Sequence, residues 1–301
     1  MVEFGFETTG DDVVAAFPGT LKGKRILITG PSWGSIGSET AITLAKGPPA
    51  MIVLLGRDIE KIQPVIDKVQ EIDPGVVTKF VPVHLDSLRS VRHSAQQILD
   101  DDSIPKIDTL INNAGIMACP YSKTEDGIER HSWLPVQSAR VINVSSYGNV
   151  LSDVLEDPNF NEGEEYNSFI SYGQSKTANV LMAVGLNSRL QGKGLKAFAL
   201  DPGSVPSNLR RFMTPDTIKE GMEVISKSAA VMPQRKTQQQ GCAITIRAVI
   251  DPDLTVDGSI FLSDTQVTSD PKVVASYSLD VSNTDRVWRM SEQLVGQRFE
   301  F

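Results

Sequence analysis

Near the start of the chain stands the run Arg25-Ile26-Leu27-Ile28-Thr29-Gly30-Pro31-Ser32-Trp33-Gly34-Ser35-Ile36-Gly37. Its apolar first part predicts a buried strand, and residues 38–45 predict the helix that follows. Glycines in such a turn let backbone N–H groups approach a pyrophosphate, at which the positive end of the helix points. The alternative is a plain strand-to-helix turn. The candidate dinucleotide contacts here are Gly30, Ser32, Trp33, Gly34, Ile36 and Gly37.

The rest of the chain continues this alternation of apolar strands and amphipathic helices. Further strands are predicted at residues 50–55, 79–85, 109–113, 140–145, 196–200 and 259–262. Further helices are predicted at residues 59–72, 91–99, 169–190 and 237–249. The pattern predicts an α/β fold with a Rossmann-like, doubly wound parallel sheet of about seven strands. We expect a single domain over residues 1–301, with a lead-in at 1–22, a substrate lid region at 204–240 and a C-terminal tail at 270–301.

Composition narrows the classes of function. The 301 residues are 40% hydrophobic and 22% charged, which is typical of a globular protein with a sizeable core. A net charge of −8 argues against nucleic acid or an anionic membrane as the main partner. No apolar run approaches the roughly 20 residues that span a bilayer, and the acidic N-terminus does not resemble a secretory signal. The two cysteines, Cys119 and Cys242, form no metal-binding spacing. We therefore expect a cytoplasmic protein with reduced thiols and no metal.

Tyr172-Gly173-Gln174-Ser175-Lys176 lies in the predicted helix 169–190. Four residues make about one helical turn, so Tyr172 and Lys176 project from the same face. A phenol is a poor acid or base at neutral pH, and a neighbouring ammonium group is expected to lower its pKa. Alone, the pair could equally be an ordinary surface tyrosine and lysine.

The second predicted strand ends in Gly56-Arg57-Asp58. A dinucleotide site reads the adenosine ribose at this position, where an acidic residue accepts from a free 2′-hydroxyl and an arginine accommodates a 2′-phosphate. Because Arg57 comes first after the strand, we favour NADP(H) as the cofactor. Asp58 keeps NAD(H) open, and both residues could be solvated loop charges.

Together these pieces resemble the short-chain dehydrogenase/reductase family over residues 22 to 264 or so. The similarity rests on motifs that occur in the family's order: Thr29–Gly37, Leu85-Asp86, Asn112-Asn113-Ala114-Gly115, Val144-Ser145-Ser146, Tyr172–Lys176 and Asp201-Pro202-Gly203. Within the family the chain is most similar to retinol-dehydrogenase-like and chloroplast-translocon-like oxidoreductases, particularly fungal ones. The runs that support this subgroup are Phe6–Thr9, Ile116–Pro120 and Leu294-Val295-Gly296.

The resemblance implies a role for each matching residue. Ser146 would hold the substrate oxygen, Tyr172 would exchange a proton with it, and Lys176 would bond the nicotinamide ribose and lower the tyrosine pKa. Asp86 would accept from the adenine amine. The adenosine side of the groove would be lined by Asn113, Ala114 and Gly115. The nicotinamide side would be lined by Pro202, Gly203, Val205 and Ser207.

One segment departs from the family pattern. Members carry a helix between the fourth and fifth strands, and its asparagine completes the catalytic tetrad. Here Gly115 and Arg140 are only 25 positions apart (140 − 115), so the predicted crossover is shortened and the asparagine segment is missing. Neither His131 nor the pair Asn112-Asn113 is a convincing substitute.

The leading hypothesis is an NADP(H)-dependent oxidoreductase of lipophilic or secondary-metabolite ketones and alcohols. The apolar residues of the lid region suit such a substrate. One alternative is a nucleotide-binding pseudoenzyme or scaffold that lost the proton relay. The other is an incomplete version of the gene product. Oligomerisation, substrate and reaction direction stay open.

Overall fold

The computed structural model describes residues 3–129, 140–228, 233–256 and 260–300. One mixed sheet has the strand order β3-β2-β1-β4-β5-β6-β7-β8, and only the β7–β8 pair is antiparallel. The strands are Arg25–Thr29 (β1), Met51–Gly56 (β2), Val77–Pro82 (β3), Thr109–Asn112 (β4), Arg140–Val144 (β5), Lys196–Asp201 (β6), Phe261–Ser263 (β7) and Gln266–Val267 (β8). The predicted Rossmann-like sheet in a single domain is confirmed, and the two-residue β8 is an addition that was not predicted.

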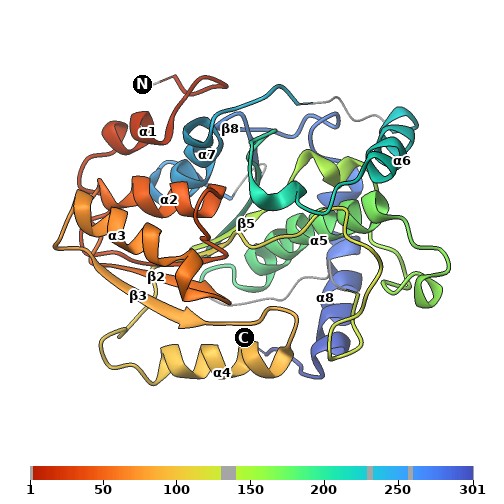
Figure 1. Cartoon of the computed structure of the whole chain (residues 1–301), viewed down its shortest axis with the longest axis horizontal. Coiled ribbons are helices and arrows are strands. Elements are labelled where there is room, and N and C mark those ends of the chain that lie inside the picture. Colours follow the sequence, from red (N-terminus) through yellow and green to blue (C-terminus); the bar gives the residue numbers. More distant parts are fainter. Residues whose placement is uncertain (1–2, 130–139, 229–232, 257–259, 301) are drawn as a thin grey trace.

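Helices cover both faces of this sheet (Figure 1). The α-helices are Gly10–Ala16 (α1), Ile36–Ala45 (α2), Gln63–Ile72 (α3), Leu88–Leu99 (α4), Ser168–Arg189 (α5), Pro215–Ser226 (α6), Gln238–Ile250 (α7) and Val281–Val295 (α8). The short 3₁₀ helices are Ile59–Lys61 (η1), Tyr147–Val150 (η2), Asn161–Gly163 (η3), Asn208–Arg210 (η4) and Ser276–Ser278 (η5). The helix predicted at 59–72 is therefore divided in two. Pro64 stands in the first turn of α3, where a missing backbone N–H costs nothing.

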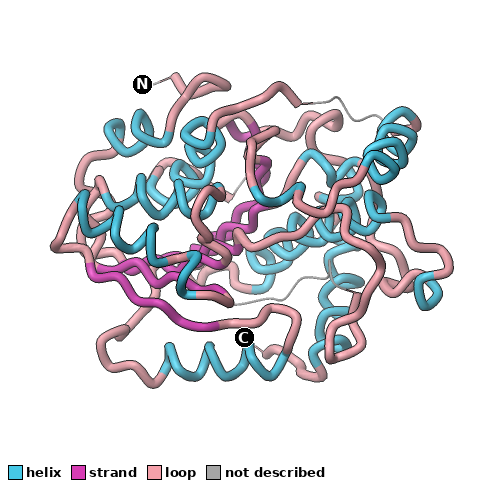
Figure 2. The backbone as a smooth tube through the Cα atoms, viewed as in Figure 1, coloured by secondary structure: helices cyan, strands magenta, loops and turns pink. Residues whose placement is uncertain are grey.

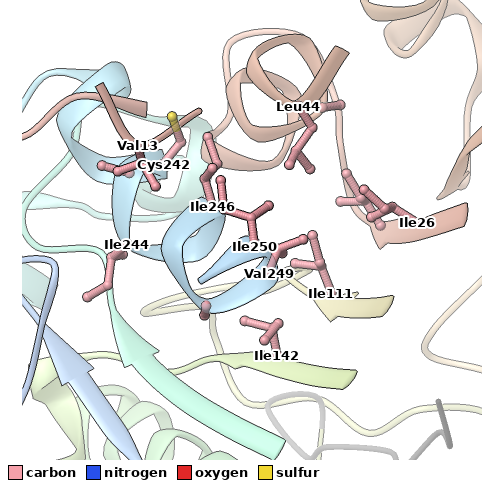
Figure 3. Close-up of a cluster of buried hydrophobic side chains, with 14 of the residues drawn as sticks. Val13, Ile26, Leu44, Ile111, Ile142, Cys242, Ile244, Ile246, Val249 and Ile250 are labelled. Atoms are coloured by element: carbon pink, nitrogen blue, oxygen red, sulfur yellow. The ribbon is translucent and has the colours of Figure 1, made fainter. Parts of the chain in front are cut away.

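Alternation along each strand sends neighbouring side chains to opposite faces of the sheet. Ile26 and Ile28 belong to a core that α1, α2, α3 and α7 close, part of which Figure 3 shows. Leu27 belongs to a second core under α4. A third core lies where α5 and α8 pack on β5, β6 and β7. The apolar strands are thus buried on both faces, as a parallel sheet requires.

The shortened crossover still joins β4 to β5 as parallel neighbours, with Ile111 opposite Ile142. Its described part, residues 113–129, contains no helix and folds back through a bridge between Lys123 and Glu129. Figure 2 shows this part as loop. Residues 130–139, including His131, lie outside the described residues.

Helix α5 is the longest helix of the described chain, and Asn167 caps its N-terminus. The Asn167 side chain accepts hydrogen bonds from the backbone N–H groups of Phe169 (3.0 Å) and Ile170 (2.9 Å). We expect Asn167→Ala to lower the free energy of unfolding by about 1 kcal/mol, because two N–H groups lose their acceptor. Asn167→Asp keeps the acceptor and is the matched control. Equal denaturant midpoints for both variants would contradict this role of the cap.

Candidate active site

The carboxyl ends of the central strands bring the predicted motifs to one edge of the sheet. The glycine loop follows β1, Asn113–Gly115 follows β4, Ser146 follows β5, and Pro202-Gly203 follows β6. Open α/β sheets bind ligands at this edge. The topology therefore assembles one site from segments that are more than 170 residues apart in sequence (Figure 1).

The glycine loop has the shape of a phosphate cradle. Gly30 adopts φ +67°, and a Cβ atom there would lie 2.9 Å from the Cα atom of Ala114. A Cβ atom on Gly37 would lie 2.3 Å from Nδ2 of Asn113, which donates to the Thr29 carbonyl at 2.8 Å. Around Gly34, by contrast, no described atom beyond its two chain neighbours comes within 4 Å of a Cβ position. The loop is thus packed against the sheet on one side and open beside the start of α2 on the other, which fits a pyrophosphate.

Ser146, Tyr172 and Lys176 meet at the end of β5. The Tyr172 hydroxyl shares a hydrogen bond with the Ser146 side chain, whose oxygen also accepts from the Gly148 N–H at 3.1 Å. The Lys176 ammonium lies 5.3 Å from the centre of the Tyr172 ring and donates to the Val144 carbonyl at 3.1 Å. All three side chains are buried, with 4–7% of each residue exposed. The structure therefore brings the three predicted catalytic residues together.

Burial sets the protonation preferences of this cluster. Burial raises the pKa of Tyr172, and the hydrogen bond with Ser146 opposes the rise only in part. Burial lowers the pKa of Lys176 to about 8, against the partial opposition of the Asp201 carboxylate. The pKa of Tyr172 is thus raised overall, and the predicted lowering by Lys176 stays a prediction. The physical reason for both shifts is that removal from water penalises both charged forms, the phenolate and the ammonium.

Asn112 is linked toward Lys176 through two asparagines that the sequence did not single out, Asn143 and Asn179. Asn112 Nδ2 donates to Asn143 Oδ1 at 2.9 Å, and Asn143 Nδ2 donates to the Asn179 carbonyl at 3.0 Å. Asn179 Nδ2 donates to the Val144 carbonyl at 3.1 Å, so this oxygen accepts from both Asn179 and Lys176. A chain of side-chain amides therefore ties β4, β5 and α5 together beneath the lysine.

Comparison with known proteins decides the family. The model of the short chain dehydrogenase family matches residues 24–157. The short-chain dehydrogenase/reductase prx1 of Penicillium roqueforti is 31% identical over 91% of this chain and 86% of its own length. The chain belongs to the short-chain dehydrogenase/reductase family. Human retinol dehydrogenase 14 is 31% identical over 93% of this dehydrogenase and 88% of its own length. Mouse retinol dehydrogenase 12 is 29% identical over 93% of the chain and 89% of its own length.

Solved structures agree on the fold. An uncharacterised protein from Mycobacterium paratuberculosis superposes on this dehydrogenase with a TM-score of 0.67 at 23% identity, over 96% of this chain and 98% of its own. A short-chain dehydrogenase from Sphingobium yanoikuyae in complex with NADPH has a TM-score of 0.54 at 18% identity, over 89% and 96% of the two chains. Family membership makes the protein an oxidoreductase that acts on a CH–OH or C=O group with a nicotinamide dinucleotide.

Arg57, Asp58 and Asp86, which are predicted to contact the adenosine part of the cofactor, differ in their surroundings. Asp58 caps η1 by accepting from the Glu60 N–H at 3.0 Å, and its second oxygen lies 3.5 Å from the Lys61 ammonium. Arg57 is exposed beside the end of β2. Asp86 lines a groove of about 550 Å³ at the outer edge of the sheet, together with His84, Ser87, Arg89, Ser90, His93, Lys123, Thr124 and Glu125.

The segment after β6 runs alongside the glycine loop. Gln238 Nε2 donates to the Gly34 carbonyl at 2.8 Å, and Asn208 Nδ2 donates to the Trp33 carbonyl at 3.5 Å. Val205 is buried against α7, where a Cβ atom on Gly241 would lie 2.4 Å from its Cγ2 atom. Ser207 caps η4 by accepting from the Leu209 N–H at 3.4 Å. One continuous segment after β6 therefore contains the predicted contacts Pro202, Gly203, Val205 and Ser207.

Sequence reasoning missed Gly148. A Cβ atom there would lie 2.8 Å from Cε1 of Tyr172, so only glycine leaves room for the ring. A glycine two residues after a strand-end serine was the available signal.

Three further observations concern the whole described chain. No helix in it combines the length and apolar character that crossing a bilayer requires. Within the described ranges, no three His, Cys, Asp or Glu side chains are grouped as metal ligands would be. Both cysteines are buried thiols.

Proposed function

We propose that this dehydrogenase is an NADP(H)-dependent oxidoreductase that interconverts a lipophilic ketone and alcohol, with Ser146, Tyr172 and Lys176 as its catalytic residues. One observation carries the assignment: the Tyr172 hydroxyl shares a hydrogen bond with Ser146 while Lys176 lies over the tyrosine ring, and all three are buried at the ligand-binding edge of the sheet. A dry, prearranged acid and hydrogen-bond donor suits proton exchange with a carbonyl oxygen.

The side chains divide the work as follows. When bound, the nicotinamide supplies or accepts the hydride. The Ser146 hydroxyl donates to the substrate oxygen and stabilises the negative charge that develops there. Tyr172 gives its phenolic proton to that oxygen in reduction and takes it back in oxidation. The ammonium of Lys176 stabilises the phenolate that remains, since a nearby positive charge favours the charged form.

A preference for NADP(H) follows from the end of β2. Both oxygens of Asp58 already have a partner, the Glu60 N–H for one and the Lys61 ammonium for the other. Arg57 is exposed and can pair with a 2′-phosphate. The NADPH complex of the Sphingobium enzyme and an NADPH-bound carbonyl reductase from chicken fatty liver support the same choice.

Support for a lipophilic substrate comes from residues 204–228 and from the named relatives. Helix α6 packs on α5 through Gly221, where a Cβ atom would lie 2.2 Å from the ring of Phe169. Phe212, Ile218 and Met222 stay 38%, 41% and 66% exposed. Apolar side chains that stay exposed are typical of a surface that binds apolar ligands. The retinol dehydrogenases among the relatives are named for an apolar alcohol.

The test is turnover by the purified protein. We expect NADPH oxidation with at least one member of a panel of lipophilic aldehydes and ketones, and NADP⁺ reduction with the matching alcohol. Thermal stabilisation by NADPH without turnover on any panel member would contradict the proposal and favour a nucleotide-binding protein without catalysis. A buffer blank and a heat-inactivated sample control for non-enzymatic oxidation.

Arg57→Gln tests the cofactor preference. Because a charge-assisted pair with a 2′-phosphate is lost, we expect Kd for NADPH to rise about 10–100-fold while Kd for NADH changes little. Cofactor fluorescence titration measures both constants. Lys68→Gln, which removes a lysine charge that pairs with Glu71 on α3, is the matched control. An equal loss for both cofactors would mean that Arg57 does not read the 2′-position.

A further inference from the structure

Asp201 bridges the two loops that form the reaction side of the site. It is the last residue of β6 and is 4% exposed. Its Oδ1 atom accepts from the Gly203 N–H at 3.0 Å. The same carboxylate accepts from the backbone N–H of Tyr147, the residue that follows Ser146. One buried side chain therefore joins the end of β5 to the turn after β6.

A buried cation stands beside this carboxylate. The Lys236 side chain is 1% exposed, its ammonium lies 2.6 Å from Oδ1 of Asp264 and 5.2 Å from the centre of the Phe6 ring. Its aliphatic stem presses on the Gly203 turn, where a Cβ atom would lie 3.0 Å from Cδ of Lys236. Burial raises the pKa of Asp201, and the Lys236 charge opposes that rise. The lysine thus supports both the charge of Asp201 and the shape of the turn.

Lys236 also joins the two ends of the segment between β6 and α7, a junction that we call the neck. The Lys236 N–H donates to the Ser204 carbonyl at 3.0 Å, and Ser204 bridges Arg235 in parallel register. Ser204 and Arg235, the two ends of this segment, therefore lie side by side. Asp264 lies in the turn between β7 and β8 and pairs with Lys236 there, in a left-handed conformation (φ +47°) that aspartate and asparagine tolerate better than most residues.

We propose that Asp201 is a positioning residue that fixes the Ser146 segment against the Gly203 turn, and that Lys236 and Asp264 hold this tie closed at the neck. The inference rests on the proposed function, because the distance it fixes is that between the substrate oxygen held by Ser146 and the nicotinamide side of the groove. Misplacement by about 1 Å between reacting groups lowers rates by about 10²-fold.

Asp201→Asn tests this positioning role, because asparagine has nearly the same volume as aspartate. We expect kcat to fall about 10–100-fold while Kd for NADPH changes by less than about threefold. Deuterium exchange at the Tyr147 and Gly203 amides should become faster, since the two N–H groups lose a charged acceptor. Asp253→Asn, in the exposed turn after α7, is the matched control.

The pH profile distinguishes positioning from simple loss of folded protein. The charged groups that act on Tyr172 or Lys176 are Asp201 and Arg210, and Tyr147 is a further titratable neighbour. The negative charge of Asp201 raises the pKa of both Tyr172 and Lys176. Without this charge the pKa of both groups should fall, so the rate of alcohol oxidation should begin to rise at a lower pH. A smaller folded fraction would reduce the rate without shifting that pH.

Asp264→Asn provides a second variant, because the Asp264 side chain is 56% exposed and asparagine keeps the left-handed turn. We expect a smaller loss of kcat than for Asp201→Asn, with faster exchange at the Gly203 amide. Unchanged exchange at both amides in Asp201→Asn would overturn the proposal even if no substrate were turned over. Unchanged kcat and pH profile in an active enzyme would overturn it independently, while an inactive wild-type protein would count against the proposed function instead.

Discussion

Tyr172→Phe is expected to lower kcat/KM for carbonyl reduction by about 10²–10⁴-fold, the usual contribution of a positioned general acid. The substitution deletes a single oxygen from a buried ring, and the Ser146 oxygen keeps the Gly148 N–H as a partner. Stability should therefore change by about 1 kcal/mol or less. Kd for NADPH should stay within about threefold of wild type, because the cradle around Gly30 and Gly37 does not depend on the phenol.

Steady-state kinetics and a fluorescence titration measure the two constants separately. Tyr166→Phe is the matched control, since its hydroxyl donates to the Cys119 carbonyl at 2.7 Å, a bond without a role in proton exchange. Full activity in Tyr172→Phe would refute the assignment of the proton donor. Parallel loss of cofactor binding and turnover would instead give the residue a structural role.

Lys176→Met is expected to lower the rate of turnover strongly and to stabilise the folded protein. Burial holds the pKa of Lys176 near 8, against an ordinary value of 10.5. This difference corresponds to about 3 kcal/mol of unfavourable free energy in the charged folded state. Methionine removes the charge at similar length, and the Val144 carbonyl keeps its bond from Asn179. The loss of rate should be about 10²–10⁴-fold, because the phenolate loses its stabilising cation.

The direction in which stability changes with pH follows from the same two pKa values of Lys176. Below pH 8 or so, folded and unfolded chains both carry the proton, and the whole penalty is present. Between about 8 and 10.5 the unfolded chain binds more protons than the folded one, so stability rises with pH. The stability of Lys176→Met should therefore rise less over this pH range than that of the wild-type protein.

Denaturant titrations of both proteins at several pH values measure the difference. Lys196→Met is the control, since Lys196 also donates to a backbone carbonyl, that of Leu254, but at the amino end of β6. A less stable Lys176→Met protein at pH 7 would contradict the burial argument, and retained activity would contradict the catalytic role.

How much of the site the sequence predicted differs from residue to residue. The glycine loop and the pair Tyr172–Lys176 were found because a turn between strand and helix, and a spacing of one helical turn, are local patterns. That Ser146 meets this pair was expected only from family resemblance, and the structure brings them together. The catalytic roles themselves stay a proposal that the variants above test.

The order of strands and helices, the parallel sheet and the place of the nucleotide loop were determined by the sequence alone, since periodicity and turn residues act between near neighbours. Tertiary structure alone decided the protonation preferences of Tyr172 and Lys176, the amide chain through Asn143 and Asn179, and the tie from Asp201 to Lys236. Burial and the meeting of distant charges depend on where every strand end arrives, and no local pattern records that.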